Sequence, residues 1–162
     1  MSTAVRLSGL SKCNSCPLYE DANIVRGIGP APTDIMLVGE APGALEDEFG
    51  IPFVGASGAK LEILLEQAQL CRDDVYITNL VKHRPPLNRN PYKREINACS
   101  HWLEDELNQV RPTIIVSLGA VAGRYFKPDL SLTREHGVPL ECEGFLLIPM
   151  YHPAAALHNP NL

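Results

Sequence analysis

Four short apolar runs, separated by helical patterns, most strongly limit the folds that this sequence can adopt. They cover residues 34–38, 75–80, 113–118 and 145–150, and their length and composition are typical of strands buried on both faces. Apolar residues three and four apart predict helices over residues 60–70 and 92–110, and a shorter helix over 120–126. This alternation predicts an α/β fold, a three-layer α/β/α sandwich around a central four-stranded, mostly parallel sheet.

Length and composition narrow the class of protein further. The chain has 162 residues and a net charge of -5, which fits a single domain over residues 1–162. The sequence has no apolar run that approaches a membrane span and no basic-then-apolar signal peptide, so we expect no membrane contact and a cytoplasmic location. The acidic balance argues against a generally basic coat on nucleic acid, although a local basic face can still contact phosphates.

Polar side chains follow or close three of the predicted strands. Glu40 lies between two glycines after the first strand, Asn79 closes the second, and His152 follows the fourth. Because the carboxyl ends of parallel strands share one edge of a sheet, we expect these three side chains to converge. Taken singly, each is more often structural, with Asn79 as a turn former and His152 as a partly buried histidine. Their convergence is what indicates an active site.

The residue types at this edge suit recognition of a flat heterocycle. Asn79 offers one donor and one acceptor, which match the carbonyl and N–H edge of uracil. Phe53, in the Gly- and Pro-rich stretch 50–55, can stack on the ring. His152 can stabilise a developing anionic oxygen, and Glu40 can activate water near the sugar. Together they predict cleavage of an N-glycosidic bond, which in duplex DNA requires flipping of the base.

The sequence resembles the iron–sulfur type of uracil-DNA glycosylase, often called family 4, over nearly the whole chain from Cys13 onward. The matching motifs are GEAPGALED at 39–47, PFVGASG at 52–58, VYITNLVKHRPPLNRNP at 75–91, Cys99, IIVSLGA at 114–120 and MYHPAAALHNP at 150–160. The resemblance implies a monofunctional enzyme that removes uracil and leaves an abasic site for downstream repair enzymes. It also implies a further C-terminal helix, which this sequence lacks after Leu162.

The family's roles carry over to matching positions. Glu40 and His152 are the expected catalytic residues, one handling water and the other stabilising the O2 charge of departing uracil. The expected substrate-binding residues are Gly39, Ala41, Glu46, Phe53 and Asn79, of which Glu46 excludes the methyl group of thymine. The expected DNA-binding residues are Lys82, Arg84, Asn88, Arg89 and Leu157, where Leu157 is an apolar wedge in the segment 154–160. No Asp or Glu occurs in the range 82–94. This absence of acidic side chains favours contact between the segment and DNA phosphates.

Cys13 and Cys16 form a CxxC pair, which by itself fits zinc as well as an iron–sulfur cluster. The resemblance adds Cys99 as a ligand, but where the family has a third cysteine this chain has His83. We therefore expect a [4Fe–4S] cluster held by three cysteines and one histidine. Three alternatives stay open: a labile cluster on three cysteines, zinc on the same four residues, or replacement of His83 by Cys71 or Cys142.

Two other functions remain compatible with the sequence. A glycosylase with broader specificity for deaminated bases would share every motif, because the pocket walls decide specificity. A non-catalytic iron–sulfur module that binds DNA or transfers electrons would keep the cysteines but would not need Glu40, Asn79 and His152. We expect the protein to be a monomer.

Overall fold

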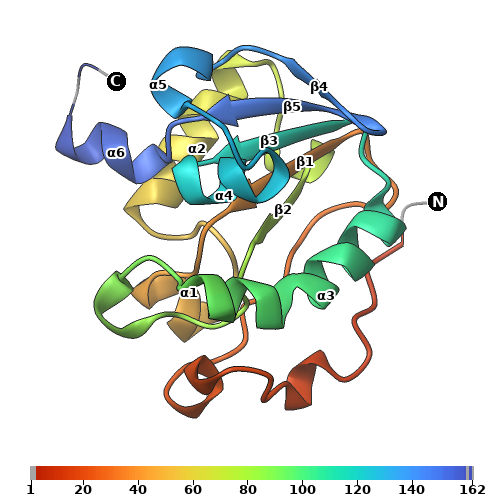
Figure 1. Cartoon of the computed structure of the whole chain (residues 1–162), viewed down its shortest axis with the longest axis vertical. Coiled ribbons are helices and arrows are strands. Elements are labelled where there is room, and N and C mark those ends of the chain that lie inside the picture. Colours follow the sequence, from red (N-terminus) through yellow and green to blue (C-terminus); the bar gives the residue numbers. More distant parts are fainter. Residues whose placement is uncertain (1–2, 160, 162) are drawn as a thin grey trace.

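The five strands of the computed structural model, which describes residues 3–159 and 161, form one mixed sheet (Figure 1). The strands are β1 (Ile35–Gly39), β2 (Tyr76–Asn79), β3 (Ile114–Leu118), β4 (Leu140–Cys142) and β5 (Phe145–Met150). Their order across the sheet is β2-β1-β3-β5-β4. The pairs β1–β2, β1–β3 and β3–β5 are parallel, and β4 runs antiparallel to β5.

The predicted four-stranded sheet is wrong by one strand. The four predicted runs do form β1, β2, β3 and β5, with ends within one residue of the predicted bounds. The additional strand, β4, is three residues long and joins β5 through a tight turn in which Gly144 has a positive φ of 89°. A short, partly polar edge strand gives almost no apolar signal, which is why the sequence pattern does not show it.

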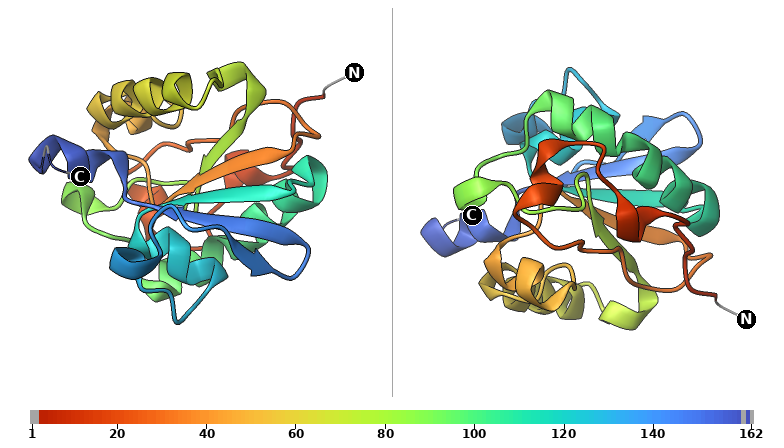
Figure 2. Two further views of the ribbon diagram at one scale, coloured as in Figure 1. Left: turned by 90° about the horizontal axis from the view of Figure 1, so that it is seen from above. Right: turned by 90° about the horizontal axis from the view of Figure 1, so that it is seen from below.

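The helices cover both faces of the sheet, with α1 and α2 on one face and α3, α4 and α5 on the other (Figure 2). Their bounds are α1 (Ala44–Phe49), α2 (Ala56–Gln67), α3 (Lys93–Val110), α4 (Ala120–Phe126), α5 (Leu132–Glu135) and α6 (Pro153–His158). Short 3-10 turns are η1 (Leu10–Lys12), η2 (Pro17–Glu20), η3 (Arg72–Asp74) and η4 (Pro86–Asn88). The helix predicted over 60–70 is α2, which begins earlier, directly after Gly55.

Local signals explain where α3 begins and ends. Glu95 accepts a hydrogen bond from the backbone N–H of Tyr92 at 2.7 Å and so satisfies a free donor at the start of the helix. The helix ends at Val110 and is followed by Arg111, which has a left-handed φ of 51° and precedes Pro112, a residue that cannot continue a helix. Leu103 and Val110 on this helix are fully buried.

Alternating side chains of the strands divide the core into two layers. Met36 and Val38 of β1 pack with Leu103 of α3 on one face, whereas Leu37 packs with Leu61 of α2 on the other. Burial of each such side chain stabilises the fold by about 1.5–3 kcal/mol. In the described part of the chain, no helix is both long and apolar enough to cross a membrane.

The parallel strands all end at the left edge of the sheet in Figure 1. Glu40 directly follows β1, Asn79 is the last residue of β2, Gly119 follows β3, and His152 lies two residues after β5. The convergence predicted from the order of strands is therefore present. Two residues of the terminal segment, Pro160 and Leu162, lie outside the described residues.

Candidate active site

A pocket of about 360 Å³ opens at the carboxyl edge of the sheet. It is lined by Glu40, Ala41, Pro42, Gly43, Glu46, Phe53, Ser57, Asn79, Asn88, Arg89, Asn90, Pro91, His152 and Ala154. Six of the seven residues predicted to act on or bind the base line it. The seventh, Gly39, lies beneath the pocket, where a Cβ atom would collide with Asn79 Oδ1 and the Phe53 ring. Only glycine leaves room for those two side chains.

The Glu40 carboxylate is fixed by the start of α4. Its Oε1 atom accepts a hydrogen bond from the Val121 backbone N–H at 3.1 Å. Burial raises the pKa of Glu40 above its usual value, and the hydrogen bond from Val121 opposes that shift. Gly119, with a positive φ of 102°, passes so close that a Cβ atom would collide with the carboxylate. Glu40 is thus a partly buried carboxylate with a raised pKa. A raised pKa suits a carboxylate that acts as a general base.

Phe53 is held in a strained backbone conformation. It has a positive φ of 54° and is 5% exposed. The guanidinium of Arg72 donates to the carbonyl oxygens of Phe53, at 2.6 and 3.2 Å, and of Pro52, at 3.0 Å. The ring centroids of Phe53 and His152 lie 5.6 Å apart with 27° between their planes. Strain of this kind persists where surrounding contacts enforce it, and it is common at binding sites.

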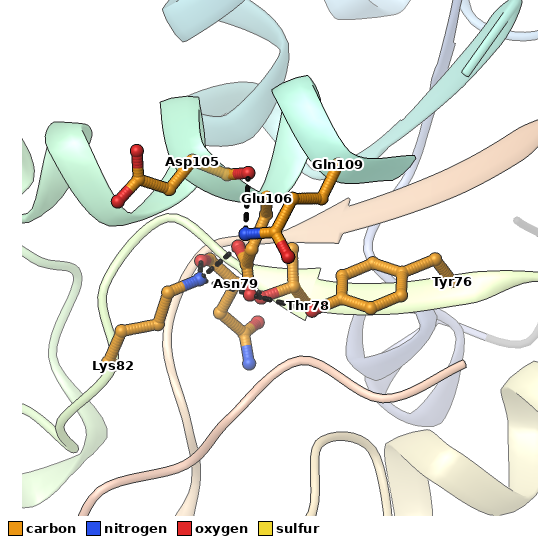
Figure 3. Close-up of polar contacts among 7 residues, drawn as sticks. All are labelled: Tyr76, Thr78, Asn79, Lys82, Asp105, Glu106 and Gln109. Carbon is orange, nitrogen blue, oxygen red and sulfur yellow. Dashed lines mark hydrogen bonds and ion pairs between the residues drawn. The ribbon is translucent and has the colours of Figure 1, made fainter. Parts of the chain in front are cut away.

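Asn79 is 3% exposed, and its Oδ1 atom is buried without a hydrogen-bond partner. Such an acceptor is costly to leave unpaired. The backbone carbonyl of Asn79 accepts a hydrogen bond from Lys82 Nζ at 2.8 Å. Figure 3 shows the amide directed away from Lys82 and Glu106. The backbone at this position is therefore fixed, while the side-chain oxygen is left for a ligand in the pocket.

His152 immediately precedes α6, and its Nδ1 atom accepts a hydrogen bond from the Ala154 backbone N–H at 3.1 Å. Burial lowers the pKa of His152, and the negative charge of Glu46 opposes that shift. The ring is thus neutral at neutral pH. Because Nδ1 accepts, the proton of the neutral ring is on Nε2, which is free to act as a donor.

Glu46 is 8% exposed and belongs to α1. Its Oε1 atom accepts hydrogen bonds from the backbone N–H groups of Val54 at 3.1 Å and Gly55 at 3.2 Å. It therefore ties α1 to the segment that carries Phe53. A residue that composition alone would assign to the surface is a buried wall of the pocket.

Of the five predicted DNA-binding residues, one does not reach the surface. Asn88 and Arg89 line the mouth of the pocket, Arg84 donates to Asn88 Oδ1 at 2.7 Å, and Leu157 on α6 is 47% exposed. Lys82 is placed differently from the prediction, because it is fully buried. Its ammonium group has no route to a phosphate in this structure.

Instead, Lys82 is part of a buried polar network between β2 and α3 (Figure 3). Its Nζ atom lies 2.6 Å from Glu106 Oε2 and donates to Thr78 Oγ1 at 2.7 Å. Glu106 Oε1 also accepts from the hydroxyl groups of Thr78 at 3.0 Å and Tyr76 at 3.1 Å. An acid on a distant helix thus supplies the counter-charge, so no local pattern marks Lys82 as buried.

The three cysteines predicted to bind metal belong to one cluster of packed side chains. Cys13, Cys16 and Cys99 pack together with Trp102, whose Nε1 atom donates to Cys13 Sγ at 3.2 Å. Burial raises the pKa of the Cys99 thiol to about 11. His83 is 3% exposed, and its Nδ1 atom is buried without a hydrogen-bond partner. Two buried thiols, the half-buried thiol of Cys13 and an imidazole nitrogen without a partner are donor types that suit a soft metal centre.

The predicted metal ligands do not form a complete metal site among the described side chains. Among the residues that the structure describes, no three His, Cys, Asp or Glu side chains are close enough together to hold a metal ion. The remaining thiols lie elsewhere, since Cys142 packs in the core around β5 and Cys71 caps η3. Neither belongs to the cluster that contains Cys13.

Sequence reasoning missed two groups of residues at the site. Ser57 and Asn90 line the pocket. They lie within the family-like motifs at 52–58 and 75–91, so the motifs offered a signal for these two residues. Arg72 acts on Phe53 from 19 positions away, and no local pattern connects these two residues.

The comparison with known proteins decides the family. The model of the "Uracil DNA glycosylase superfamily" matches residues 26–162. The chain belongs to this superfamily. It is 42% identical to the "Type-4 uracil-DNA glycosylase" of Thermotoga maritima over 154 residues, which cover 93% of this chain and 80% of that protein. The glycosylase of the same type from Archaeoglobus fulgidus is 41% identical and aligns over 94% of this chain and 82% of its own length.

A more distant relationship connects the chain to another type within the superfamily. The "Type-5 uracil-DNA glycosylase" of Pyrobaculum aerophilum is 35% identical, over 74% of this chain and 61% of that protein. The higher identity and coverage place this glycosylase chain with the type-4 relatives, as the motifs in its sequence predicted.

Proposed function

We propose that this protein removes uracil from DNA by hydrolysing its N-glycosidic bond and leaves an abasic site. The observation that carries the proposal is the buried, unpartnered Oδ1 atom of Asn79 in a pocket beside Phe53. Uracil supplies the missing partner, because its N3–H donates to Oδ1 while its O4 accepts from the amide nitrogen. Cytosine offers the opposite pattern and leaves both groups unpaired.

Phe53 and Glu46 shape the rest of the base site. The ring of Phe53 is held by Arg72 and stacks on the base, so little freedom is lost when the base enters. Glu46 is held by Val54 and Gly55 and narrows the pocket where thymine would place its methyl group. If thymine entered, its methyl group would remove water from the Glu46 carboxylate and offer no hydrogen bond in return, so thymine binding would be unfavourable.

His152 assists departure of the base. When the C1′–N1 bond breaks, its electrons move into the uracil ring and negative charge develops on O2. The Nε2–H of neutral His152 donates to that oxygen. A fixed neutral donor in a buried site stabilises the developing charge and requires no proton transfer.

Glu40 completes the hydrolysis on the sugar side. Its carboxylate accepts a proton from water as the water oxygen bonds to C1′, and the same negative charge stabilises the positive sugar. Because Val121 holds one carboxylate oxygen, the group keeps a fixed position during the reaction. Uracil leaves as the anion and takes a proton from solvent.

The activity is tested with single- and double-stranded oligonucleotides that carry one uracil, followed by alkali cleavage at abasic sites. Wild-type protein is expected to cleave the strand at the uracil, while Asn79→Leu, which keeps the volume, is expected to lose about a hundredfold or more in rate. Glu141→Gln, an exposed change on β4, is the matched control and should keep full activity. If the wild type cleaved neither the single-stranded nor the double-stranded substrate, the proposed function would be refuted.

We further propose that Cys13, Cys16, His83 and Cys99 hold a [4Fe–4S] cluster. The support is the shared packing of the thiols and the unpaired buried Nδ1 atom of His83. Once bound, such a cluster joins the N-terminal segment, the loop after β2 and helix α3, and so supplies structure to the DNA-facing side. The thiols and the imidazole must turn toward one another when the cluster forms.

The ligand set is tested by replacing His83. His83→Cys should retain iron and the visible absorption of the cluster and lower its reduction potential, since imidazole ligation raises the potential. His83→Ala should lose iron or release it more easily, whereas Cys71→Ser, an exposed thiol away from the cluster, should change nothing. Stoichiometric zinc without iron in the wild type would identify the zinc alternative. Unchanged iron content and spectrum in His83→Ala would remove His83 from the ligand set.

A further inference from the structure

Leu87 is far more exposed than any other large apolar side chain in the described part of the chain. It is 95% exposed, compared with 62% for Phe49, the next most exposed. It lies in the short turn η4, between β2 and α3. A fully solvated leucine gains no packing energy from its position.

The backbone of Leu87 is also unfavourable for a leucine. Its φ is 55° and its ψ is 28°, which is the left-handed helical region. Residues with a Cβ atom are disfavoured there, and Asn is one of the few types that tolerate it. The following Asn88 has the same φ and is of that tolerant type. A leucine here therefore destabilises the fold through backbone strain, and its exposure offers no packing energy in return.

The turn is nevertheless firmly held. Pro85 and Pro86 restrict its entry, and Arg84 Nε donates to Asn88 Oδ1 at 2.7 Å. On the exit side, both terminal nitrogens of Arg89 bond to Glu95, at 2.8 and 2.9 Å. The tip that carries Leu87 is thus presented outward by a stiff support. Strain that is enforced in this way is a reason to look for function.

The turn stands at the mouth of the base pocket. The four residues after Leu87, from Asn88 to Pro91, line that pocket. Ala154 of α6 lines it as well, and Leu157 lies one turn further along that helix. Both segments project at the left edge of the molecule in Figure 1, at the end where the parallel strands finish. The two exposed leucines are therefore carried by different segments that border one pocket.

The surroundings favour nucleic acid as the partner of this tip. Lys93 and Arg94 at the start of α3 are exposed, and no acid occurs in the range 82–94. An isolated apolar side chain such as Leu87 does not provide the continuous apolar patch that a protein interface needs. It does match a DNA duplex, where apolar side chains enter between base pairs while cations contact phosphates.

We propose that Leu87 is a second apolar wedge, which enters the base stack of double-stranded DNA next to the flipped uracil. It would fill space that the base leaves or separate the adjacent base step, so that the uracil stays in the pocket. This rests on the proposed glycosylase function. Because single strands have no paired stack to open, the side chain should matter for duplex substrates alone.

The test compares Leu87→Ala and Leu87→Gly with wild type on single- and double-stranded DNA that contains the same uracil. Both variants should lose about tenfold in single-turnover rate on the duplex and stay within about twofold on the single strand. Leu87→Gly should also melt about 2 °C higher, since glycine relieves the left-handed strain. A residue with only a structural role would not raise stability and lower duplex activity together.

Fluorescence of 2-aminopurine next to the uracil gives a readout that does not depend on catalysis. Binding of the wild type should increase this fluorescence, and binding of Leu87→Ala should increase it less. Leu87→Phe, which keeps a large apolar side chain, should increase it as much as the wild type does. Leu146→Ala is the matched control, because this partly exposed leucine lies near the amino end of β5, away from the pocket.

Equal losses on both substrates, or unchanged duplex activity, would overturn the wedge. A change of molecular mass in sedimentation on replacement of Leu87 would also overturn it, because the tip would then be a contact between copies of the chain. An inactive wild type on both substrates would instead refute the glycosylase function itself.

Discussion

Lys82 and Glu106 form a completely buried ion pair, with Nζ 2.6 Å from Oε2. The same ammonium group donates to the backbone carbonyl of Asn79 at 2.8 Å, and the Lys82 backbone opposes the rise that burial causes in the pKa of the Cys99 thiol. One residue therefore joins the end of β2, which carries Asn79, to the helix that carries a proposed cluster ligand. A disturbance of this pair should affect both sites.

Breaking the pair from one side should be costly. Lys82→Met leaves Glu106 buried without its counter-charge, and we expect a loss of about 3–5 kcal/mol in the free energy of unfolding by urea. The double variant Lys82→Met with Glu106→Leu removes both charges and should recover much of that loss. Lys127→Met, which breaks an exposed pair with Asp129, should cost less than about 1 kcal/mol. If Lys82→Met and Lys127→Met lowered the free energy of unfolding equally, the buried ion pair of Lys82 would not contribute as described.

Replacement of Glu40 should separate stability from activity. Its pKa is raised by burial, so the folded state binds the proton more tightly than the unfolded state does, and stability falls as pH rises through that pKa. Glu40→Gln removes the buried charge, so the variant should melt at a higher temperature than the wild type at pH 8. Below about pH 4 the two should melt alike, because the carboxyl group of Glu40 is then protonated. The excision rate of the variant should drop by at least about a hundredfold. A variant that melts lower at pH 8 would show that the carboxylate stabilises the fold.

The protonation of His152 should be visible by NMR. Its pKa is lowered by burial, so at pH 7 the ring should be neutral with the proton on Nε2. As pH falls below about 6.5, the unfolded state takes up a proton that the folded state resists, and stability declines. His152→Gln should weaken that decline and reduce excision by about a hundredfold. A ring that is charged at pH 7 would rule out the neutral-donor role.

Arg72 should act on catalysis through Phe53. Arg72→Lys cannot reproduce the forked hydrogen bonds to the carbonyl oxygens of Pro52 and Phe53. We expect about a tenfold loss in kcat/KM, mainly through KM, because the stacking ring is no longer held. Glu62→Gln breaks the half-exposed ion pair of Arg72, at 2.9 Å, and serves as the control with little effect. An unchanged KM in Arg72→Lys would show that Phe53 keeps its position without this contact.

Much of the pocket followed from the pattern of the chain. The apolar runs identified β1, β2, β3 and β5, and their parallel arrangement places Glu40, Asn79 and His152 at one edge. That inference needs only the direction of the strands, which alternating helices already imply. The resemblance then added Glu46, whose burial no periodic pattern shows.

The sequence by itself therefore determined four of the five strands, the edge at which Glu40, Asn79 and His152 meet, and the family, because apolar periodicity and ordered motifs are local properties of a chain. Tertiary structure alone decided which charges lie inside. Lys82 belongs to a run of basic residues, yet Glu106, 24 positions away, provides the partner that makes its burial possible. Arg72 and Phe53 are likewise joined only by folding. Contacts of this kind depend on which side chains meet in space, and that meeting has no signature in the neighbouring sequence.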